Sequence, residues 1–279
     1  MKTLKTITTC LFFAVICSCS TNKNITDNDL TKRNLKGSVK TVTELNFELI
    51  ADGNDLIKGN KSINADPDVV LHFNKNGFLT KKQVLNFDGS VMNTYIYEYD
   101  KNNQLIKETK YTATENIDRV FTFTYQNGKL KSQTIHTALG GVESVDKFSY
   151  PTATLMRQET FDKSENPMYF FDYEYDKNKN MTKKVWHVNN NIVQMLYVYN
   201  DKNQLVQQTE INENDIETKW QYTYDEHGNI TQEITTFFDE SQINKDMTYE
   251  YDAQGNWIIR LTFADGQPLF VTERSIEYF

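Results

Sequence analysis

The feature that most constrains this chain is an aromatic anchor that recurs about every 25 residues. The positions two and four residues before each anchor are also apolar, with the single exception of Asp146, whereas the positions between them are mostly polar. An apolar face at every second residue is the pattern of a half-buried β-strand, and its regular return indicates a chain of repeated β-hairpins. The anchors are Phe73, Tyr99, Tyr125, Tyr150, Tyr175, Tyr199, Tyr224 and Tyr251.

The residues after each anchor have turn chemistry. Aspartates follow several anchors directly, as Asp100 and Asp225 do, and can accept hydrogen bonds from the backbone of their own turn. Four residues past most anchors comes a residue that tolerates positive φ, such as Gly77 or Asn103, and an apolar residue then opens the return strand. The turns that contain Lys179 and the segment 151–153 (Pro-Thr-Ala) depart from this pattern, so we expect these two hairpins to be irregular.

The two ends of the array fit the same frame. Residues 35–39 resemble the second half of a unit and residues 275–279 the first half, so the terminal strands can pair. About seventeen strands spaced about 4.8 Å apart would make a sheet on the order of 80 Å wide, which twist and apolar burial would curl. We therefore predict an all-β fold, an antiparallel β-hairpin repeat meander of about seventeen strands curled into a barrel-like or spiral shell, with its tyrosines facing inward.

A membrane-spanning barrel is the rival architecture. Such a barrel needs an apolar band on its outer surface and a last strand in which apolar and polar residues alternate up to the final residue. In this chain one face of the strands is charged, and Ser275 and Glu277 share the register of Phe279. Both observations favour a shell outside the bilayer.

Two units carry a family resemblance. The stretches 222–230 (YTYDEHGNI) and 249–257 (YEYDAQGNW) resemble the YD repeats of RHS-type proteins. The similarity extends over about three-quarters of the chain, from Val69 to the end, but the units are longer than the family repeat and several lack the Gly or the Asp. The resemblance implies hairpin architecture, and the array is too short for the closed shell that the large members build around a toxin.

The N-terminus predicts export. Residues 1–18 combine Lys2 and Lys5 with a short apolar run, as a cleaved signal peptide does. The stretch 16–19 (ICSC) resembles the lipobox of bacterial lipoproteins, of the Bacteroidota kind by its composition, and this resemblance implies lipid attachment at Cys19. An ordinary signal peptide is the alternative. Residues 19–34 are expected to form a lipidated, flexible tether and residues 35–279 the repeat domain. By resemblance to lipoprotein sorting, Ser20 argues against retention in the inner membrane. No acidic residues directly follow Cys19 as a surface-export signal, so the periplasmic face of the outer membrane is expected.

Composition excludes several chemistries. The three cysteines lie within the first nineteen residues, so the mature body has no disulfide, no cysteine zinc site and no cysteine nucleophile. The net charge of −8 argues against a nucleic-acid partner. No phosphate loop and no nucleophile elbow is present. We predict no catalytic residue, no metal and no cofactor.

Titratable residues give weak signals only. His136 and His187 share a repeat column but stand two units apart, which is too far for a shared metal unless the shell folds them together. Most carboxylates recur in turns, although Glu159 with Asp146 stays open as an acid/base pair, the arrangement that a hydrolase would need.

The first binding candidates are two residues that break the repeat: Trp186 lies outside the column, and Trp257 replaces the usual Leu. Tyr111 and His187, on the less regular return strands, are further candidates. Our first hypothesis is a non-enzymatic, envelope-anchored binding or scaffold module with an unknown protein or glycan partner. A carbohydrate-binding lipoprotein is the second and would be favoured by a solvent-facing row of aromatics. An apolar-ligand carrier is the third and would need an unfilled cavity lined by Tyr and Phe.

Overall fold

The computed structural model describes residues 28–189 and 191–279. It consists of one short helical turn, α1 (Asp29–Lys32), and nineteen antiparallel strands. The strands are β1 (Val39–Asp52), β2 (Asp55–Lys61), β3 (Val69–Phe73), β4 (Leu79–Leu85), β5 (Val91–Tyr99), β6 (Leu105–Thr112), β7 (Ile117–Gln126), β8 (Lys129–Thr137), β9 (Val142–Ser149), β10 (Leu155–Asp162), β11 (Pro167–Tyr175), β12 (Met181–Val188), β13 (Asn191–Tyr199), β14 (Leu205–Ile211), β15 (Glu217–Tyr224), β16 (Ile230–Thr236), β17 (Gln242–Tyr251), β18 (Trp257–Ala264) and β19 (Gln267–Tyr278).

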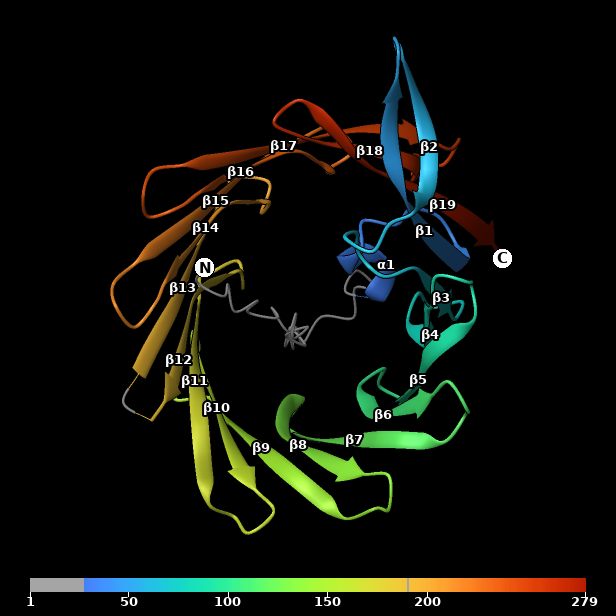
Figure 1. The fold of residues 1–279 in the computed structure, drawn as a ribbon. Helices are drawn as coiled ribbons and strands as arrows, with labels where there is room; N and C mark the ends of the chain where they lie inside the picture. The colour runs from blue at the N-terminus through green and yellow to red at the C-terminus, as the bar shows by residue number, and fades with distance from the viewer. Residues whose placement is uncertain (1–27, 190) are drawn as a thin grey trace, which may run out of the picture.

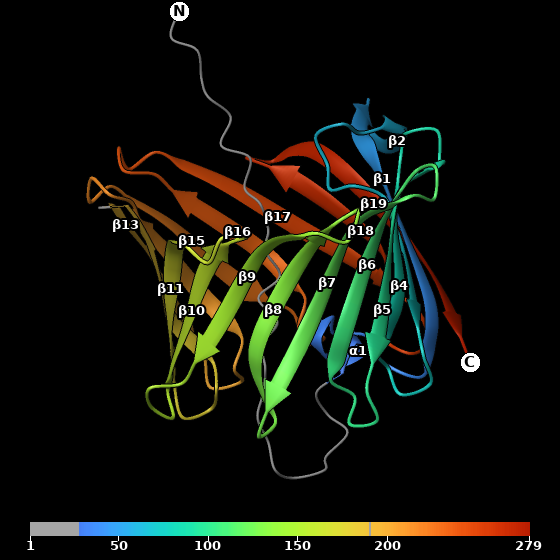
Figure 2. The ribbon, with the colours of Figure 1, turned by 90° about the horizontal axis from the view of Figure 1, so that it is seen from below.

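The sheet closes on itself. From β3 to β19 each strand pairs with the next, and β1 pairs with both β19 and β3, which makes a closed barrel of 18 strands (Figures 1 and 2). This confirms the predicted antiparallel meander and shows the barrel rather than the spiral. The extra strand, β2, pairs with the far half of β1 and projects with it from the ring. Its sequence carries no repeat anchor, and for that reason the sequence did not predict it.

The seam between β1 and β19 joins the two half-units, as predicted. Nine residue pairs run from Val39 with Tyr278 to Glu48 with Phe270. Towards the β2 end of the seam the buried Asn46 accepts a hydrogen bond from Thr272 Oγ1 (2.7 Å) and donates its backbone N–H to Asp68 Oδ1 (2.6 Å). The bond with Thr272 fixes the register between strands that lie more than two hundred residues apart in the chain.

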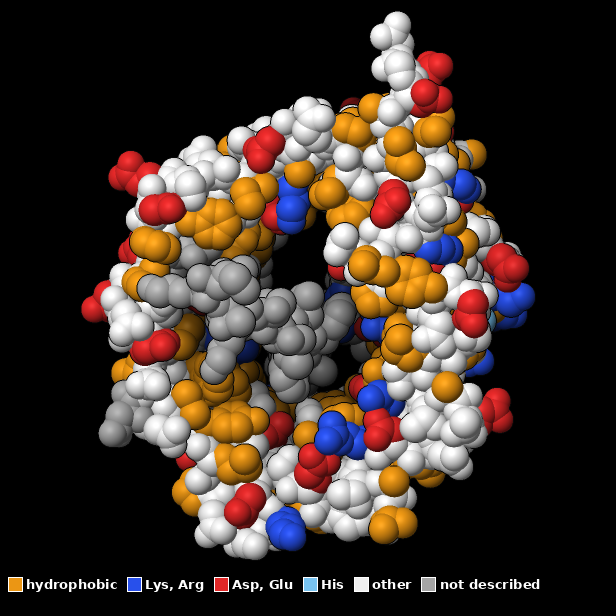
Figure 3. All heavy atoms as spheres, in the orientation of Figure 1, with side chains coloured by type: hydrophobic (Ala, Val, Ile, Leu, Met, Phe, Trp, Pro, Cys, Tyr) orange, Lys and Arg blue, Asp and Glu red, His pale blue; other side chains and the backbone are white. Residues whose placement is uncertain are grey.

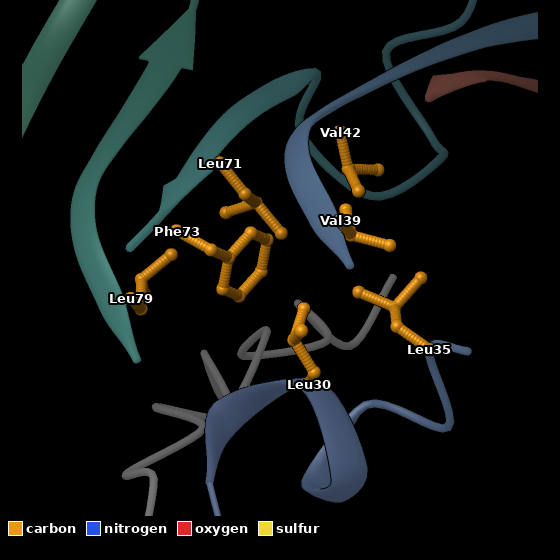
Figure 4. Packing of buried hydrophobic residues seen from close by; sticks show 7 residues of the cluster. All are labelled: Leu30, Leu35, Val39, Val42, Leu71, Phe73 and Leu79. Carbon is orange, nitrogen blue, oxygen red and sulfur yellow. The ribbon is translucent and has the colours of Figure 1, made fainter. Parts of the chain in front are cut away.

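The position of α1 shows which face of the sheet is the inner one. α1 lies inside the ring (Figure 1), and Leu30 packs there against Leu71, Phe73 and Leu79 (Figure 4). Alternate residues of a strand face opposite sides, so the anchor columns line the inside of the barrel. α1 falls within residues 19–34, the range assigned to the tether, and Leu30 and Leu35 belong to the buried core. No helix in the described residues is long and apolar enough to cross a membrane.

The anchor tyrosines also tie each hairpin to the preceding one. Backbone pairing between β14 and β15 stops at Gln207 with Gln221, before the strands reach the anchor turns. Beyond that point the hydroxyl of Tyr224 donates to the carbonyl oxygen of Leu205 (2.5 Å). The same bond recurs around the barrel from Tyr99 to Leu79, Tyr125 to Leu105, Tyr150 to Leu130 and Tyr199 to Met181. A tyrosine hydroxyl therefore takes the place of a backbone donor where the strands separate.

The turn that contains Lys179 is regular, contrary to the prediction. Lys179 has a φ of 69°, and its N–H donates to the Asp176 carbonyl at 3.0 Å, as Asn103 does to Asp100. The Asp176 carboxylate accepts from the backbone N–H of Asn178 and of Asn180, so its bonds hold the turn despite the strain of a non-glycine residue. Residues 151–154 form bends of a different kind, as expected.

We predict that Tyr199→Phe lowers the free energy of unfolding by about 0.5–1.5 kcal/mol, because it leaves the Met181 carbonyl without its donor. Urea denaturation followed by circular dichroism measures the change. Tyr111→Phe is the matched control, since the Tyr111 hydroxyl makes no hydrogen bond within the described residues. Equal midpoints for the two variants would contradict the structural role of the ladder.

Candidate functional site on the inner wall

The inner wall alternates aromatic and polar side chains. Within most hairpins an anchor-strand aromatic stands directly beside a polar residue of the return strand. Such pairs are Tyr97 with Glu108, Tyr173 with Lys184, Tyr197 with Gln208, Tyr222 with Glu233 and Tyr249 with Arg260. Along the axis, hydrophobic, acidic and basic side chains surround a central opening (Figure 3). A barrel of this strand number is too wide for its own side chains to fill, so the wall is amphipathic rather than a dry core.

An aromatic platform occupies the wall at β11 and β12. Trp186 pairs with Phe171 across the two strands and stacks on it, with ring centroids 6.0 Å apart and an interplanar angle of 18°. Tyr169 meets Trp186 edge to face at 6.3 Å. Trp186 keeps 37 % of its surface exposed, and Tyr169 and Phe171 are half-buried. The platform therefore offers an aromatic surface to the lumen.

Polar groups border the platform. The Lys184 ammonium lies 4.5 Å from the Phe171 ring centroid, and burial lowers the pKa of Lys184. The Tyr173 hydroxyl donates to Gln158 Oε1 (2.8 Å). This combination of aromatic faces with a few fixed polar groups is typical of small-molecule sites.

Trp257 also belongs to the inner wall, but it is buried. Only 8 % of its surface is exposed. The Arg274 guanidinium covers its ring at 3.4 Å, and Tyr249 packs against it at a centroid distance of 6.0 Å. Trp257 therefore supports its neighbours and presents no open ring face.

Tyr111 and His187 lie on the outer face. Tyr111 pairs with Thr94, and His187 pairs with Phe170, on the face opposite the anchors. His187 stacks on Phe170 at 4.1 Å, and its Nε2 lies 3.6 Å from Asp172 Oδ2. The four candidates from the sequence therefore do not converge, and Trp186 alone of them stands open to the lumen.

The structure separates the acid/base pair that the sequence left open. Glu159 pairs with Lys147 and Phe170 on the outer face, whereas Asp146 pairs with Thr160 and Gln133 on the inner face. Among residues 28–189 and 191–279, no three His, Cys, Asp or Glu side chains are arranged to hold a metal ion. Cys19 and the signal peptide lie outside the described residues.

Asp146, the single polar member of the anchor columns, is a buried carboxyl group. It keeps 6 % of its surface and accepts a hydrogen bond from Thr160 Oγ1 at 2.6 Å. Burial raises the pKa of Asp146 above its ordinary value, and the bond to Thr160 partly opposes this. The break in the aromatic column was the sequence signal for this group.

Comparisons with known proteins give structural neighbours only. The chain is similar to a porin-like protein from Bacteroides uniformis at 12 % identity and a TM-score of 0.45, over 87 % of this chain and 99 % of that one. A porin-like protein from Bacteroides vulgatus matches at 12 % identity and a TM-score of 0.39, over 86 % and 98 %. A chain of a TcdB2–TccC3 structure matches at 12 % identity and a TM-score of 0.22, over 80 % of this chain and 16 % of that one. No protein-family model and no curated protein matches the sequence.

We predict that Asp146→Asn changes the pH dependence of stability. Because the folded pKa of Asp146 is raised, the wild-type protein loses stability as pH rises from about 4, the unfolded aspartate value, through the folded pKa. Asparagine keeps the acceptor for Thr160 without the charge. The variant should therefore gain stability relative to wild type as pH rises from 4 to 7, as measured by thermal unfolding at each pH.

Asp172→Asn is the matched control with the opposite sign. The hydrogen bonds from Arg157 lower the pKa of Asp172, so its stabilisation is present at neutral pH and is lost as pH falls through the folded pKa. The control should be less stable than wild type at pH 7, and the deficit should shrink in acid. If the stability of both variants relative to wild type changed with pH in the same direction, the opposite pKa shifts of Asp146 and Asp172 would be refuted.

Proposed function

We propose that this chain is a non-catalytic binding barrel, anchored in the cell envelope through acyl chains on Cys19, that takes a polyhydroxylated, glycan-like ligand against its inner wall. The observation that carries the proposal is the open platform of Trp186, Phe171 and Tyr169. An aromatic ring offers an apolar face to the C–H surface of a sugar, while neighbouring polar groups bind its hydroxyls.

The composition of the wall favours a glycan over an apolar ligand. A carrier of apolar molecules needs a continuous apolar cavity. Here Lys184 and Gln208 interrupt the aromatic surface on alternate strands, and burying them against hydrocarbon would leave their polar groups without partners. A sugar can stack its C–H face on the aromatic side chains and form hydrogen bonds with the polar ones.

The acid/base pair that the sequence left open is not arranged for hydrolysis. Glycoside hydrolysis needs two carboxyl groups on either side of one bond, about 5–9.5 Å apart. Asp146 and Glu159, the pair suggested by the sequence, face opposite sides of the sheet.

A protein partner is the second candidate, favoured by the loops at the end of the barrel opposite the anchor turns. These loops carry apolar side chains in solvent, among them Leu139 (98 % exposed), Ile63 (75 %) and Phe238 (71 %). Exposed apolar side chains spaced around one rim could contact a protein that covers the end of the barrel. Crosslinking in cells with a tagged full-length chain distinguishes the candidates, because a specific protein partner favours the rim and recovered glycan favours the lumen.

We predict that Trp186→Ala weakens glycan binding at least tenfold, because it removes the exposed ring of the platform. A glycan array identifies the strongest ligand of the wild-type protein, and titration calorimetry compares the variants. His187→Ala is the matched control, one residue along the strand on the outer face, and should bind as wild type does. If both variants bind equally, or if the wild-type protein binds no glycan on the array, the lumen proposal is wrong.

We also predict that Cys19→Ala releases the protein from the membrane and removes the mass of the acyl chains. Stable anchoring requires more than one acyl chain, so loss of the attachment residue should shift the chain to the soluble fraction. Fractionation and intact-mass spectrometry test this. Unchanged retention and unchanged mass would show that the anchor is wrong, and this outcome is independent of the Trp186 result.

A further inference from the structure

Two arginines stand side by side on the inner wall, far from the Trp186 platform. Arg260 lies on β18 and pairs with Thr272 of β19, and Arg274 lies two residues further along β19 on the same face. The guanidinium carbons lie 5.3 Å and 3.4 Å from the centroid of the Trp257 ring. Six strand-to-strand spacings separate Arg260 on β18 from Trp186 on β12, which is on the order of 30 Å along the wall.

Positive charge exceeds negative charge around these arginines. Glu44, directly across the seam from Arg274, binds its Nη2 at 2.8 Å. Burial and the neighbouring Arg260 lower the pKa of Arg274 and Glu44 opposes them, so two guanidinium groups face one carboxylate. Tyr249 stands beside Arg260, and burial raises the pKa of its hydroxyl, which stays neutral. A cationic patch of this kind inside a chain of net charge −8 calls for a physical reason.

The guanidinium hydrogen bonds are incomplete. Arg260 donates from Nη2 to Thr272 Oγ1 (3.1 Å), and Arg274 donates from Nη2 to Glu44. The Nε groups of both are buried and have no hydrogen-bond partner within residues 28–189 and 191–279. Only 9 % of the Arg274 side chain is exposed. Native proteins satisfy most buried donors, so such a group indicates a bound ion, a water or a functional role.

We infer that Arg260 and Arg274 form a binding site for an oxyanion, a carboxylate, sulfate or phosphate group. Guanidinium groups present planar, paired donors that match the oxygens of such anions. Trp257 and Glu44 hold Arg274 in place before the ligand arrives, which lowers the entropy cost of binding. The anion can be a free ion or the acidic substituent of a ligand in the lumen.

The test titrates oxyanions into the full-length protein in a neutral detergent without sugar groups. Sodium sulfate, sodium phosphate and sodium glucuronate are the probes, glucose is the uncharged control, and sodium chloride keeps the ionic strength constant. Trp257 lies against both guanidiniums, so intrinsic tryptophan fluorescence reports occupancy. Because Trp186 is itself exposed, the titrations are repeated in Trp186→Ala, where we expect a saturable change with at least one oxyanion and none with glucose. If only sulfate or phosphate binds, the ligand of the site is a free ion. If glucuronate binds more tightly than either, the ligand is an acidic sugar.

The variants assign the site. Arg260→Gln should weaken oxyanion binding at least tenfold. Arg260→Lys keeps the charge but lacks the planar donors, so its affinity should lie between those of wild type and Arg260→Gln. Lys245→Gln is the matched control, because Lys245 is an inner-wall cation already paired with Glu233 at 3.1 Å. Thermal unfolding confirms that each variant folds. A non-saturating response to every salt, or equal affinity in wild type and Arg260→Gln, would overturn the inference. Trp186→Ala should leave oxyanion binding unchanged, which separates this result from the glycan test.

Discussion

The pairing of β1 with β19 is the interaction on which the rest of the structure depends. Without it the sheet would end in two exposed edges and enclose no lumen. The seam also holds the polar groups with the most specific geometry. The hydrogen bond between Asn46 and Thr272 fixes the register of the seam. The hydrogen bond between Glu44 and Arg274 joins the same two strands on the inner wall. Closure and the inferred oxyanion site therefore share their residues, because strands from opposite ends of the chain meet there.

The width of the barrel explains why its inner wall is amphipathic. Small barrels fill their interiors with side chains, whereas eighteen strands leave an open space that water or a ligand can occupy. In such a wall a lysine or an arginine can lie along an aromatic ring. The pairs of Tyr173 with Lys184 and Tyr249 with Arg260 are examples. This wall distinguishes the proposed glycan-binding barrel from a carrier of apolar ligands.

The anchor tyrosines have two roles that one side chain can combine. Their rings line the lumen, and their hydroxyls bond to the preceding hairpin where the backbone ladder has ended. Phenylalanine supplies the ring alone, and the one phenylalanine anchor, Phe73, packs against Leu30 of α1. The recurrence of tyrosine at the other anchors follows from this need for a donor at each junction between hairpins.

The sequence by itself determined the repeated hairpins and most of their turns, because alternation along a strand and the chemistry of a turn are local properties. It also singled out Trp186 and Asp146, since each breaks a repeat column. The tertiary structure decided that the sheet closes as a barrel, that β2 projects from it, and that Trp257 is covered while Trp186 is open. It also placed Glu44 beside Arg274. Closure depends on the number of strands and on the total shift in register between neighbouring strands around the sheet, and no local sequence pattern encodes that total.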